Sequence, residues 1–167
     1  MPAALRPAAA EDAEELADLQ IAAWRAGFSG ILPPGYELPP REDFLAGADR
    51  AMRESGVVRT VAEVDGRIAG FCTHGPSRDA DAGPAIGEIR ALFVHPERWR
   101  TGVGAGLLTN ALDDLRAEGR DEATLWSFDE NEVANAFYEK LGFRRDGARE
   151  RREALGGATV VRYRRGL

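Results

Sequence analysis

Three glycines at alternate positions form the stretch of this sequence best suited to chemistry. Gly102, Gly104 and Gly106 follow a mostly apolar run, residues 86–94, and precede apolar residues at helical spacing. The run predicts a buried strand, and the spacing predicts an amphipathic helix that begins at the glycines. Glycine lets the backbone approach a ligand closely, and the first N–H groups of a helix attract anions. The stretch therefore predicts a cradle for phosphate groups.

Two other phosphate-binding loops do not fit these residues. A P-loop ends in Gly-Lys-Ser or Gly-Lys-Thr, whereas Gly106 is followed by Leu107 and Leu108. The dinucleotide fingerprint G-x-G-x-x-G requires a third glycine where Leu107 stands, and it belongs to a first βαβ unit. The loop alone is equally consistent with a helix that merely begins with a tight turn.

A second motif lies in residues 122–143. It predicts a short strand over residues 123–128, a polar turn and a helix. The fixed residues of the motif are Asn131, Ala134, Phe137, Tyr138, Gly142 and Phe143. With the glycine loop, this motif resembles the GNAT superfamily of acetyl-CoA-dependent N-acetyltransferases, whose later helix reads Asn-x-x-Ala-x-x-Phe-Tyr-x-x-x-Gly-Phe. The family's loop reads Gln/Arg-x-x-Gly-x-Gly/Ala, and here Trp99 replaces the Gln or Arg.

The resemblance implies a fold and a co-substrate. The expected fold is a single α/β domain over residues 1–167, a mixed twisted sheet of about six to seven strands flanked by about four helices. The co-substrate is acetyl-CoA, whose pantetheine arm lies in this family against the central strand and whose pyrophosphate lies at the glycine loop. The implied cofactor-binding residues are Leu92, Phe93, Val94, Arg100, Thr101, Gly102, Val103, Gly104, Ala105 and Asn131.

Acetyl transfer to an amine needs a deprotonated amine, a stabilised oxyanion and a protonated leaving thiolate. The resemblance assigns the last role to Tyr138, and the alternative is that Tyr138 merely packs beside Phe137. Glu88 stands where several family members carry the base, and a carboxylate within an apolar strand is a reasonable base in itself. The alternative for Glu88 is an ion pair, for example with Arg90. Backbone of the same strand is expected to stabilise the oxyanion.

Residues 27–40 are rich in glycine and proline and predict the longest loop. In the family this region covers the acceptor, so the resemblance implies that Trp24, Phe28 and Tyr36 line the acceptor site. The alternative is that these rings only pack the loop onto the core. His74 is expected at a strand end or on the surface rather than in catalysis.

Composition limits the class of protein further. A net charge of −6 argues against a nucleic-acid partner. No apolar run approaches a membrane span, and Cys72 with two histidines makes a protein-only metal site unfavourable. We therefore expect a cytoplasmic protein without a metal, and a homodimer is compatible with the sequence.

The sequence thus predicts an N-acetyltransferase whose acceptor is the primary amine of a small molecule or amino acid. The first alternative is acetylation of a protein N-terminus or lysine, which requires an open groove rather than an enclosed pocket. The second is a non-catalytic acyl-CoA-binding regulatory module, which needs neither Glu88 nor Tyr138. The sequence does not name the acceptor.

Overall fold

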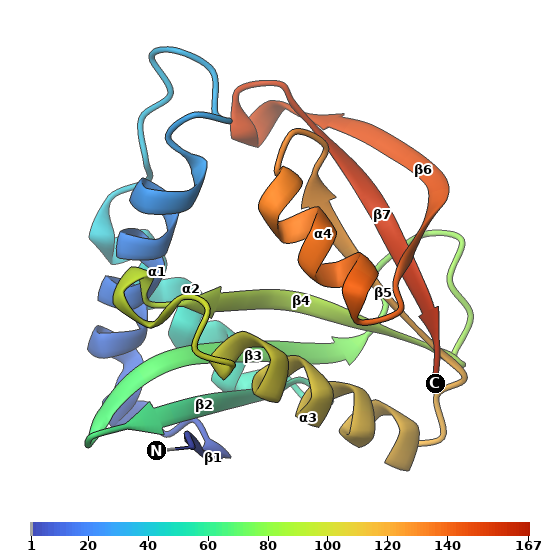
Figure 1. Cartoon of the computed structure of the whole chain (residues 1–167), viewed down its shortest axis with the longest axis horizontal. Helices are drawn as coiled ribbons and strands as arrows, with labels where there is room; N and C mark the ends of the chain where they lie inside the picture. The colour runs from blue at the N-terminus through green and yellow to red at the C-terminus, as the bar shows by residue number, and fades with distance from the viewer. Residues whose placement is uncertain (1) are drawn as a thin grey trace.

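The computed structural model describes residues 2–167. These residues form one seven-stranded sheet with the strand order β1-β2-β3-β4-β5-β7-β6 (Figure 1). The strands are β1 (Ala4–Pro7), β2 (Val58–Val64), β3 (Arg67–Pro76), β4 (Ile86–Val94), β5 (Glu122–Phe128), β6 (Arg144–Arg152) and β7 (Ala158–Gly166). The α-helices are α1 (Ala13–Phe28), α2 (Arg41–Arg53), α3 (Val103–Ala117) and α4 (Glu132–Lys140). The predicted mixed α/β fold is confirmed.

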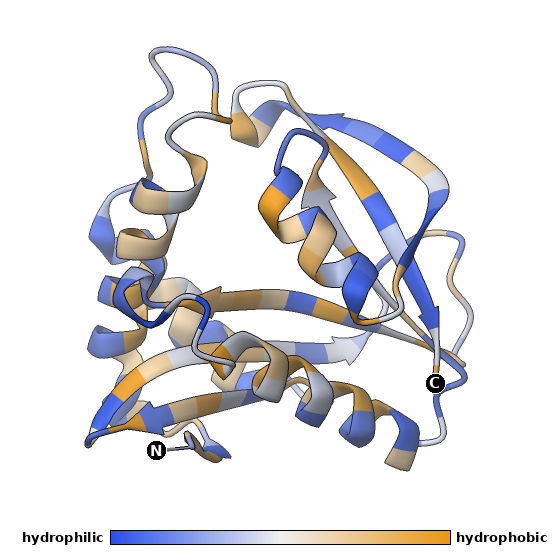
Figure 2. Cartoon of the chain, in the orientation of Figure 1, coloured by the Kyte–Doolittle hydropathy of each residue, from blue (hydrophilic) through white to orange (hydrophobic). Residues whose placement is uncertain are grey.

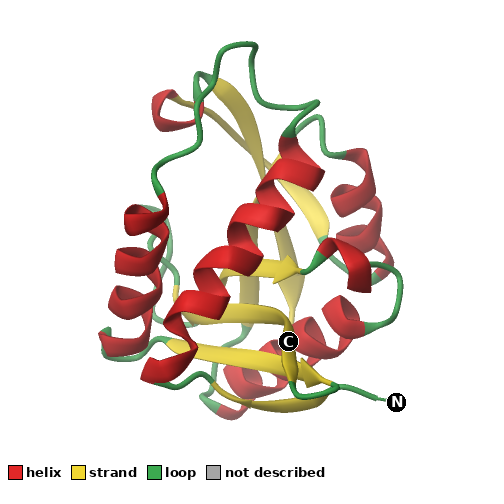
Figure 3. Cartoon of the chain, turned by 90° about the vertical axis from the view of Figure 1, so that its left-hand side faces the viewer, coloured by secondary structure: helices red, strands yellow, loops and turns green. Residues whose placement is uncertain are grey.

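The helices cover both faces of the sheet, with α2 on one side and α3 and α4 on the other (Figure 3). On the first face, α1 and α2 pack over β2 and β3. The residues of this cluster are Leu16, Leu19, Ala48, Val61, Ile68 and Phe71. On the second face, the apolar stripe of α3 packs against the central strands. Its buried residues are Val103, Leu107, Leu108, Ala111, Leu112 and Leu115, which are the positions that the helical spacing predicts.

The hairpin of β2 and β3 turns at Asp65-Gly66. Both residues have positive φ angles, 54° for Asp65 and 74° for Gly66. Two consecutive left-handed residues match the twist of antiparallel strands in a tight turn. The turn pairs Val64 with Arg67, and a bulge between Ala62 and Glu63 then shifts the register by one residue, so that Cys72 lies opposite Thr60.

The central strand β4 changes partner along its length. Its antiparallel pairing with β3 shifts register at Arg90, because Ala91 lies opposite Thr73 while Ile89 lies opposite His74. An extra residue of this kind bends a strand and increases its twist. The parallel pairing of β4 with β5 covers only residues 86–88. Beyond Glu88 the two strands diverge, which leaves one side of the second half of β4 without a strand partner.

The hairpin of β6 and β7 pairs as far as Arg152 and Ala158, beyond a bulge between Arg145 and Arg149. Strand β6 forms an edge of the sheet and is mostly hydrophilic (Figure 2). Its arginines are largely exposed, as expected of a solvated edge. Arg162 of β7 is an exception to that expectation, since it is buried.

Within the described residues, no helix combines the length and apolar character needed to cross a membrane.

Candidate active site

The glycine loop presents a row of unpaired backbone donors at the N-terminus of α3. Within residues 2–167, the N–H groups of residues 100–105 donate to no backbone carbonyl, and the first N–H that does so is that of Gly106, to Gly102. Arg100 and Gly102 both have positive φ angles, 62° and 89°. Alternating backbone conformations of this kind gather N–H groups into an anion-binding concavity, and the helix dipole adds positive potential. These are the donors that the predicted phosphate cradle requires.

Gly104 lies one turn into this cradle and faces inward. A Cβ atom there would lie 3.5 Å from Cγ2 of Val94 and 3.6 Å from Cζ of Phe137. Gly104 therefore faces the region where β4 and α4 approach each other, whereas a Cβ on Gly102 would contact nothing. The two glycines serve different needs: Gly102 provides backbone conformation, and Gly104 keeps side-chain bulk away from the end of β4.

The second half of β4 carries the residues expected to contact the pantetheine arm. Leu92, Phe93 and Val94 all lie beyond the point where β4 leaves β5. The carbonyl of Val94 accepts a hydrogen bond from the indole Nε1 of Trp99, at 2.9 Å. Trp99 is 45% exposed, and its ring would be 3.9 Å from a Cβ on Gly27 at the end of α1. Trp99, which replaces the Gln or Arg of the family motif, thus connects the glycine loop to the end of α1.

Asn131 caps α4 rather than pointing freely into the opening. Its Oδ1 accepts a hydrogen bond from the N–H of Ala134, at 3.2 Å. Asn135, one turn later, is buried and ties α4 to the end of β5: its Nδ2 donates to the carbonyl of Phe128 and its Oδ1 accepts from Ser127 Oγ. The two asparagines therefore fix the start of the helix that carries Tyr138.

Tyr138 is half-buried among rings, with Phe137 5.4 Å and Tyr163 6.2 Å away between centroids. Within residues 2–167, its hydroxyl makes no hydrogen bond to protein. Burial raises the pKa of the Tyr138 phenol above its usual range, and the nearby thiol of Cys72 raises it further. The hydroxyl is therefore protonated at neutral pH and has its donor free for a ligand. This geometry accommodates both the packing role and the role of proton donor.

Glu88 is buried at the last position where β4 pairs with β5. Its carboxylate forms an ion pair, but the partner expected from the sequence is wrong. Arg90 pairs with Glu54 beyond the end of α2, at 3.0 Å, whereas Arg78 holds Glu88, with Nη2 2.7 Å from Oε1. The bulge at Arg90 separates its side chain from that of Glu88. Arg78 was missed because it lies in the loop between β3 and β4, where the sequence shows only a polar segment.

The aromatic residues of α1 pack beside the divergence of β4 and β5. The ring of Phe28 lies 4.8 Å from that of Phe128 and 6.4 Å from that of Phe93, while Trp24 packs on Phe28 at 5.1 Å. Phe28 thus contacts both diverging strands. The rings of Trp24 and Phe28 are half-buried and pack on one another, so the arrangement agrees with either interpretation of these residues.

Tyr36 lies further away, in the loop between α1 and α2. Its hydroxyl donates to the carbonyl of Ala154, at 3.4 Å, in the short 3₁₀ segment η3 (Glu153–Leu155) between β6 and β7. Pro33 of the same loop would be 2.6 Å from a Cβ on Gly156. These contacts close one side of the region between α1 and the β6–β7 hairpin.

A network of charges ties the β3–β4 loop to the sheet. The buried Arg162 guanidinium contacts Asp79 at 3.1 Å, Asp81 at 2.7 Å and Asp146 at 2.7 Å. The indole of Trp126 also donates to Asp79, at 2.9 Å. Hydrogen bonds from Arg162 hold the pKa of Asp81 below its usual value. No sequence signal indicates this network, because its members are up to 83 residues apart.

His74 lies near the end of β3, which is one of the two places expected of it, but it is not on the surface. It is fully buried on the α3 face of β3, with Nε2 3.8 Å from Asp114 and 3.9 Å from Glu118. Within residues 2–167 neither ring nitrogen has a hydrogen-bond partner. Burial lowers the pKa of His74, and the two carboxylates oppose that effect. The described residues contain no group of three or more His, Cys, Asp or Glu side chains placed to hold a metal ion.

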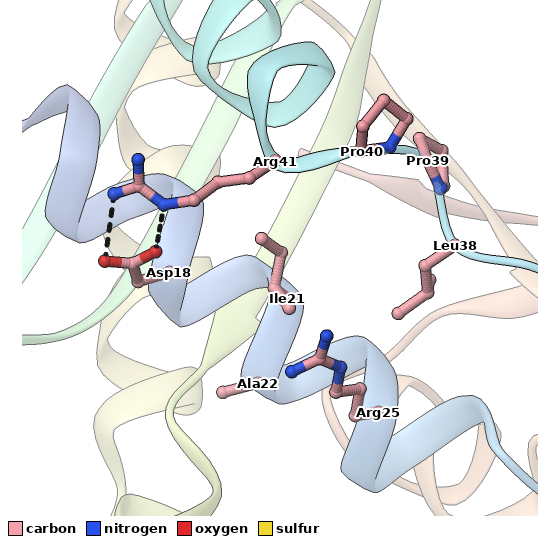
Figure 4. A pocket seen from close by; sticks show the side chains of 8 residues that line it. All are labelled: Asp18, Ile21, Ala22, Arg25, Leu38, Pro39, Pro40 and Arg41. Atoms are coloured by element: carbon pink, nitrogen blue, oxygen red, sulfur yellow. Dashed lines mark hydrogen bonds and ion pairs between the residues drawn. The ribbon is translucent and has the colours of Figure 1, made fainter.

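Two surface pockets lie apart from the residues expected in catalysis and cofactor binding. One, of about 520 Å³, lies between α1 and the segment Leu38, Pro39 and Pro40, where the ion pair of Asp18 and Arg41 borders it (Figure 4). The other, of about 780 Å³, lies along the acidic N-terminal half of α1. Neither is lined by Glu88, Tyr138 or residues 100–105.

Comparisons with known proteins agree with this geometry. The family described as "Acetyltransferase (GNAT) family" matches residues 14–143. A probable N-acetyltransferase of Mycobacterium tuberculosis is 30% identical over 96% of this chain and 91% of its own length. The mycothiol acetyltransferase of Acidimicrobium ferrooxidans is 38% identical over 50% of this chain, which spans only 26% of that protein. The solved PaiA N-acetyltransferase of Thermoplasma acidophilum, in complex with coenzyme A, is 21% identical, with a TM-score of 0.78 and full coverage of both chains.

Proposed function

Because this chain belongs to the acetyltransferase (GNAT) family, we propose that it transfers an acetyl group from acetyl-CoA to the primary amine of a small molecule or amino acid. The family is the one whose two motifs the sequence resembles. The observation that carries the proposal is the junction of three features: the unpaired N–H groups of residues 100–105, the free edge of β4 beyond Glu88, and the unpartnered hydroxyl of Tyr138.

Acetyl-CoA fits this junction by its chemistry. The pyrophosphate is an anion suited to the N–H groups at the start of α3. The pantetheine arm carries amide groups that pair with the unpaired edge of β4 as an added strand does. Leu92 and Phe93 are the residues we assign to it, and Asn131 acts through the position of α4. The complex of the PaiA neighbour with coenzyme A supports the same co-substrate for this chain.

The reaction moves three protons. Glu88, directly or through water, takes the proton that the ammonium loses, and the neutral amine nitrogen then attacks the thioester carbonyl carbon to form a C–N bond. The nitrogen gives its second proton to solvent as the tetrahedral intermediate collapses and the C–S bond breaks. Tyr138 gives its proton to the departing thiolate and is reprotonated from solvent. Backbone N–H groups of β4 stabilise the oxyanion in between.

A small acceptor is favoured over a peptide by the contacts of the loop between α1 and α2. Tyr36 and Pro33 meet the segment between β6 and β7, which closes one side of the acceptor region. Phe28 and Trp24 border the same region from α1. The name of the mycothiol acetyltransferases, which match about half of this chain, also supports a small-molecule acceptor.

The direct test is thiol release from acetyl-CoA, measured with a panel of small amines, amino acids and peptides. We expect turnover with a small amine and weak turnover with peptides. If the protein acetylated peptides alone, the acceptor would be a protein N-terminus or lysine rather than a small amine. Calorimetry is run in parallel, because acetyl-CoA binding without turnover on any amine would favour the non-catalytic acyl-CoA-binding module.

A further inference from the structure

One residue, Arg78, holds the whole carboxylate of Glu88. Its backbone N–H donates to Oε2 at 2.9 Å, its Nη2 donates to Oε1 at 2.7 Å, and its Nε lies 3.3 Å from Oε2. The guanidinium therefore approaches side-on, through its Nε and Nη2 edge. A guanidinium has five N–H donors in a fixed fork, so Nη1 and the outer side of Nη2 do not take part in this ion pair.

The two partners differ sharply in exposure. The side chain of Glu88 is 4% exposed, whereas that of Arg78 is 60% exposed. The carboxylate is thus covered by the guanidinium, and the outer donors of that guanidinium face solvent. A ligand that approaches Glu88 meets Arg78 first.

The other acids near Arg78 have arginine partners of their own. Glu54 is held by Arg90 at 3.0 Å, and Asp79 is held by Arg162 at 3.1 Å. Among residues 2–167, no carboxylate except that of Glu88 lies within ion-pair distance of Arg78. The outer edge of Arg78 therefore remains free to bind an anion that comes from outside the chain.

The backbone that carries Arg78 is fixed on both sides. Ser77 donates its N–H to the carbonyl of Ile86 at 3.0 Å, and the N–H of Asp79 donates to Ser77 Oγ at 3.2 Å. Asp79 is also held by Trp126 and Arg162. Arg78 is consequently presented at a defined place above Glu88.

We infer that Arg78 selects acceptors that carry a carboxylate close to the reacting amine. This inference rests on the proposed function and narrows it to amino acids and related amine carboxylates. A simple ammonium that approaches Glu88 is repelled by the guanidinium. An acceptor with its own carboxylate removes that repulsion, since the carboxylate binds the outer Nη1 and Nη2 donors end-on while the ammonium faces Glu88. Arg78 thus orients Glu88 and recognises the acceptor.

The test compares each amino acid with its carboxamide as acceptor, at saturating acetyl-CoA. For the wild type we expect kcat/KM to be about 10- to 100-fold higher with the amino acid than with its carboxamide, mainly through a lower KM. This is the effect expected when the carboxamide loses one charge-assisted bidentate contact. The carboxamide has the less basic amine, so amine basicity does not produce this preference. Arg78→Gln should abolish the preference, and Arg78→Lys, which keeps the charge but not the fork, should restore part of it.

Arg116→Gln is the matched control. Arg116 is 52% exposed and forms an ion pair of 2.8 Å with Asp113 on α3, so it shares no charged partner with Arg78. The control should keep the full preference for the carboxylate. A purely structural role of Arg78 predicts a lower melting temperature with an unchanged ratio of the two KM values, and that result would overturn the inference.

The inference and the proposed function fail in different ways. Equal use of acid and amide by the wild type refutes the selection by Arg78 and leaves the acetyltransferase intact. Absence of turnover with any amine refutes the proposed function instead. In that case calorimetry on the protein loaded with coenzyme A still decides the inference. The inference requires the amino acid to bind more tightly than its amide, and it requires Arg78→Gln to lose that difference.

Discussion

The two halves of the proposed site are built from different parts of the chain. The proposed cofactor half uses backbone, namely the N–H groups of residues 100–105 and the free edge of β4. The proposed acceptor half uses side chains, namely Arg78 on Glu88, and Arg162 on three aspartates that fix the β3–β4 loop. Backbone donors need only a conformation, whereas side-chain sites need particular residues. Substitutions should therefore affect the two halves by different mechanisms.

The largest effect is expected in the acceptor half, at Arg162. Arg162→Gln leaves Asp79 and Asp81 without their arginine partner and leaves Asp146 with Arg164 alone, and breaking a buried ion pair from one side costs about 3 kcal/mol. Chemical denaturation should show this loss of unfolding free energy. Kinetics should show a raised acceptor KM with unchanged acetyl-CoA affinity, because the loop that carries Arg78 is released.

Arg164 offers a control on the same strand. It is 29% exposed and contacts Asp146 and Glu122 at 3.2 and 3.5 Å. Arg164→Gln should cost less than about 1 kcal/mol, as is usual for partly exposed ion pairs. If both variants lost equal stability, the network would not be the element that fixes the loop.

The next largest effect is expected between the two halves, at Tyr138. Tyr138→Phe removes the proton donor and little volume, so kcat should fall about 100-fold while acetyl-CoA affinity and melting temperature stay close to those of the wild type. Tyr163→Phe is the contrasting variant, since its hydroxyl lies 3.1 Å from Glu139 and 3.0 Å from Arg145. It should lower stability by about 1 kcal/mol with little change in kcat. Wild-type kcat in Tyr138→Phe would assign the proton to water.

A smaller effect is expected in the cofactor half, at Gly102. Its φ of 89° is unfavourable for any residue with a Cβ, so Gly102→Ala should cost about 1 kcal/mol of unfolding free energy. Acetyl-CoA affinity should fall with it, because relaxation of the loop disperses the N–H groups. Gly106→Ala is the control: its φ is not positive and its Cβ has open space, so the variant should gain roughly 0.5–1 kcal/mol. Unchanged acetyl-CoA affinity in Gly102→Ala would contradict the backbone cradle.

The smallest effect is expected at His74, which belongs to neither half of the site. Its pKa is lowered in the folded protein from an ordinary value of 6.5, so the unfolded chain takes up a proton first as pH falls. The contribution of His74 to the free energy of unfolding is complete above pH 6.5 and declines below that pH. The decline is less than about 1.4 kcal/mol per pH unit, because Asp114 and Glu118 face the ring and favour its charged form.

Denaturation curves between neutral pH and pH 5 measure this effect. His74→Gln should flatten the acid dependence, and His95→Gln, which removes the second histidine of the chain, should preserve it. If the wild type and both variants showed the same acid dependence, the loss of unfolding free energy would come from carboxylates rather than from His74.

The difference between the halves also explains what the sequence predicts. The strand of residues 86–94, the helix that starts at Val103 and the helix after residue 131 follow from local patterns, because backbone conformation depends on nearby residues. The GNAT motifs belong to those same segments. The elements that carry the proposed cofactor half were therefore predicted from the sequence, and the divergence of β4 from β5 agrees with what the resemblance implies.

The acceptor half depends on contacts between distant residues. Arg78 meets Glu88 only after β3 and β4 have paired, and Arg162 meets Asp81 across 81 residues of chain. Sequence reasoning placed Arg90 beside Glu88 because both lie on one strand, but it could not foresee the bulge. The burial of His74 near the end of β3 was not foreseen for a similar reason, since its ring lies against Asp114 of the distant helix α3.

The arginines along β6 have a consequence for behaviour at high concentration. The outer side of this strand carries backbone groups that could pair with a strand of another molecule. Arg144, Arg145, Arg149 and Arg151 are exposed along it. When two copies approach edge to edge, these side chains bring like charges together and oppose growth of one continuous sheet. The same residues that make the edge polar thus protect the chain from ordered aggregation, most strongly in dilute salt, where charges are least screened.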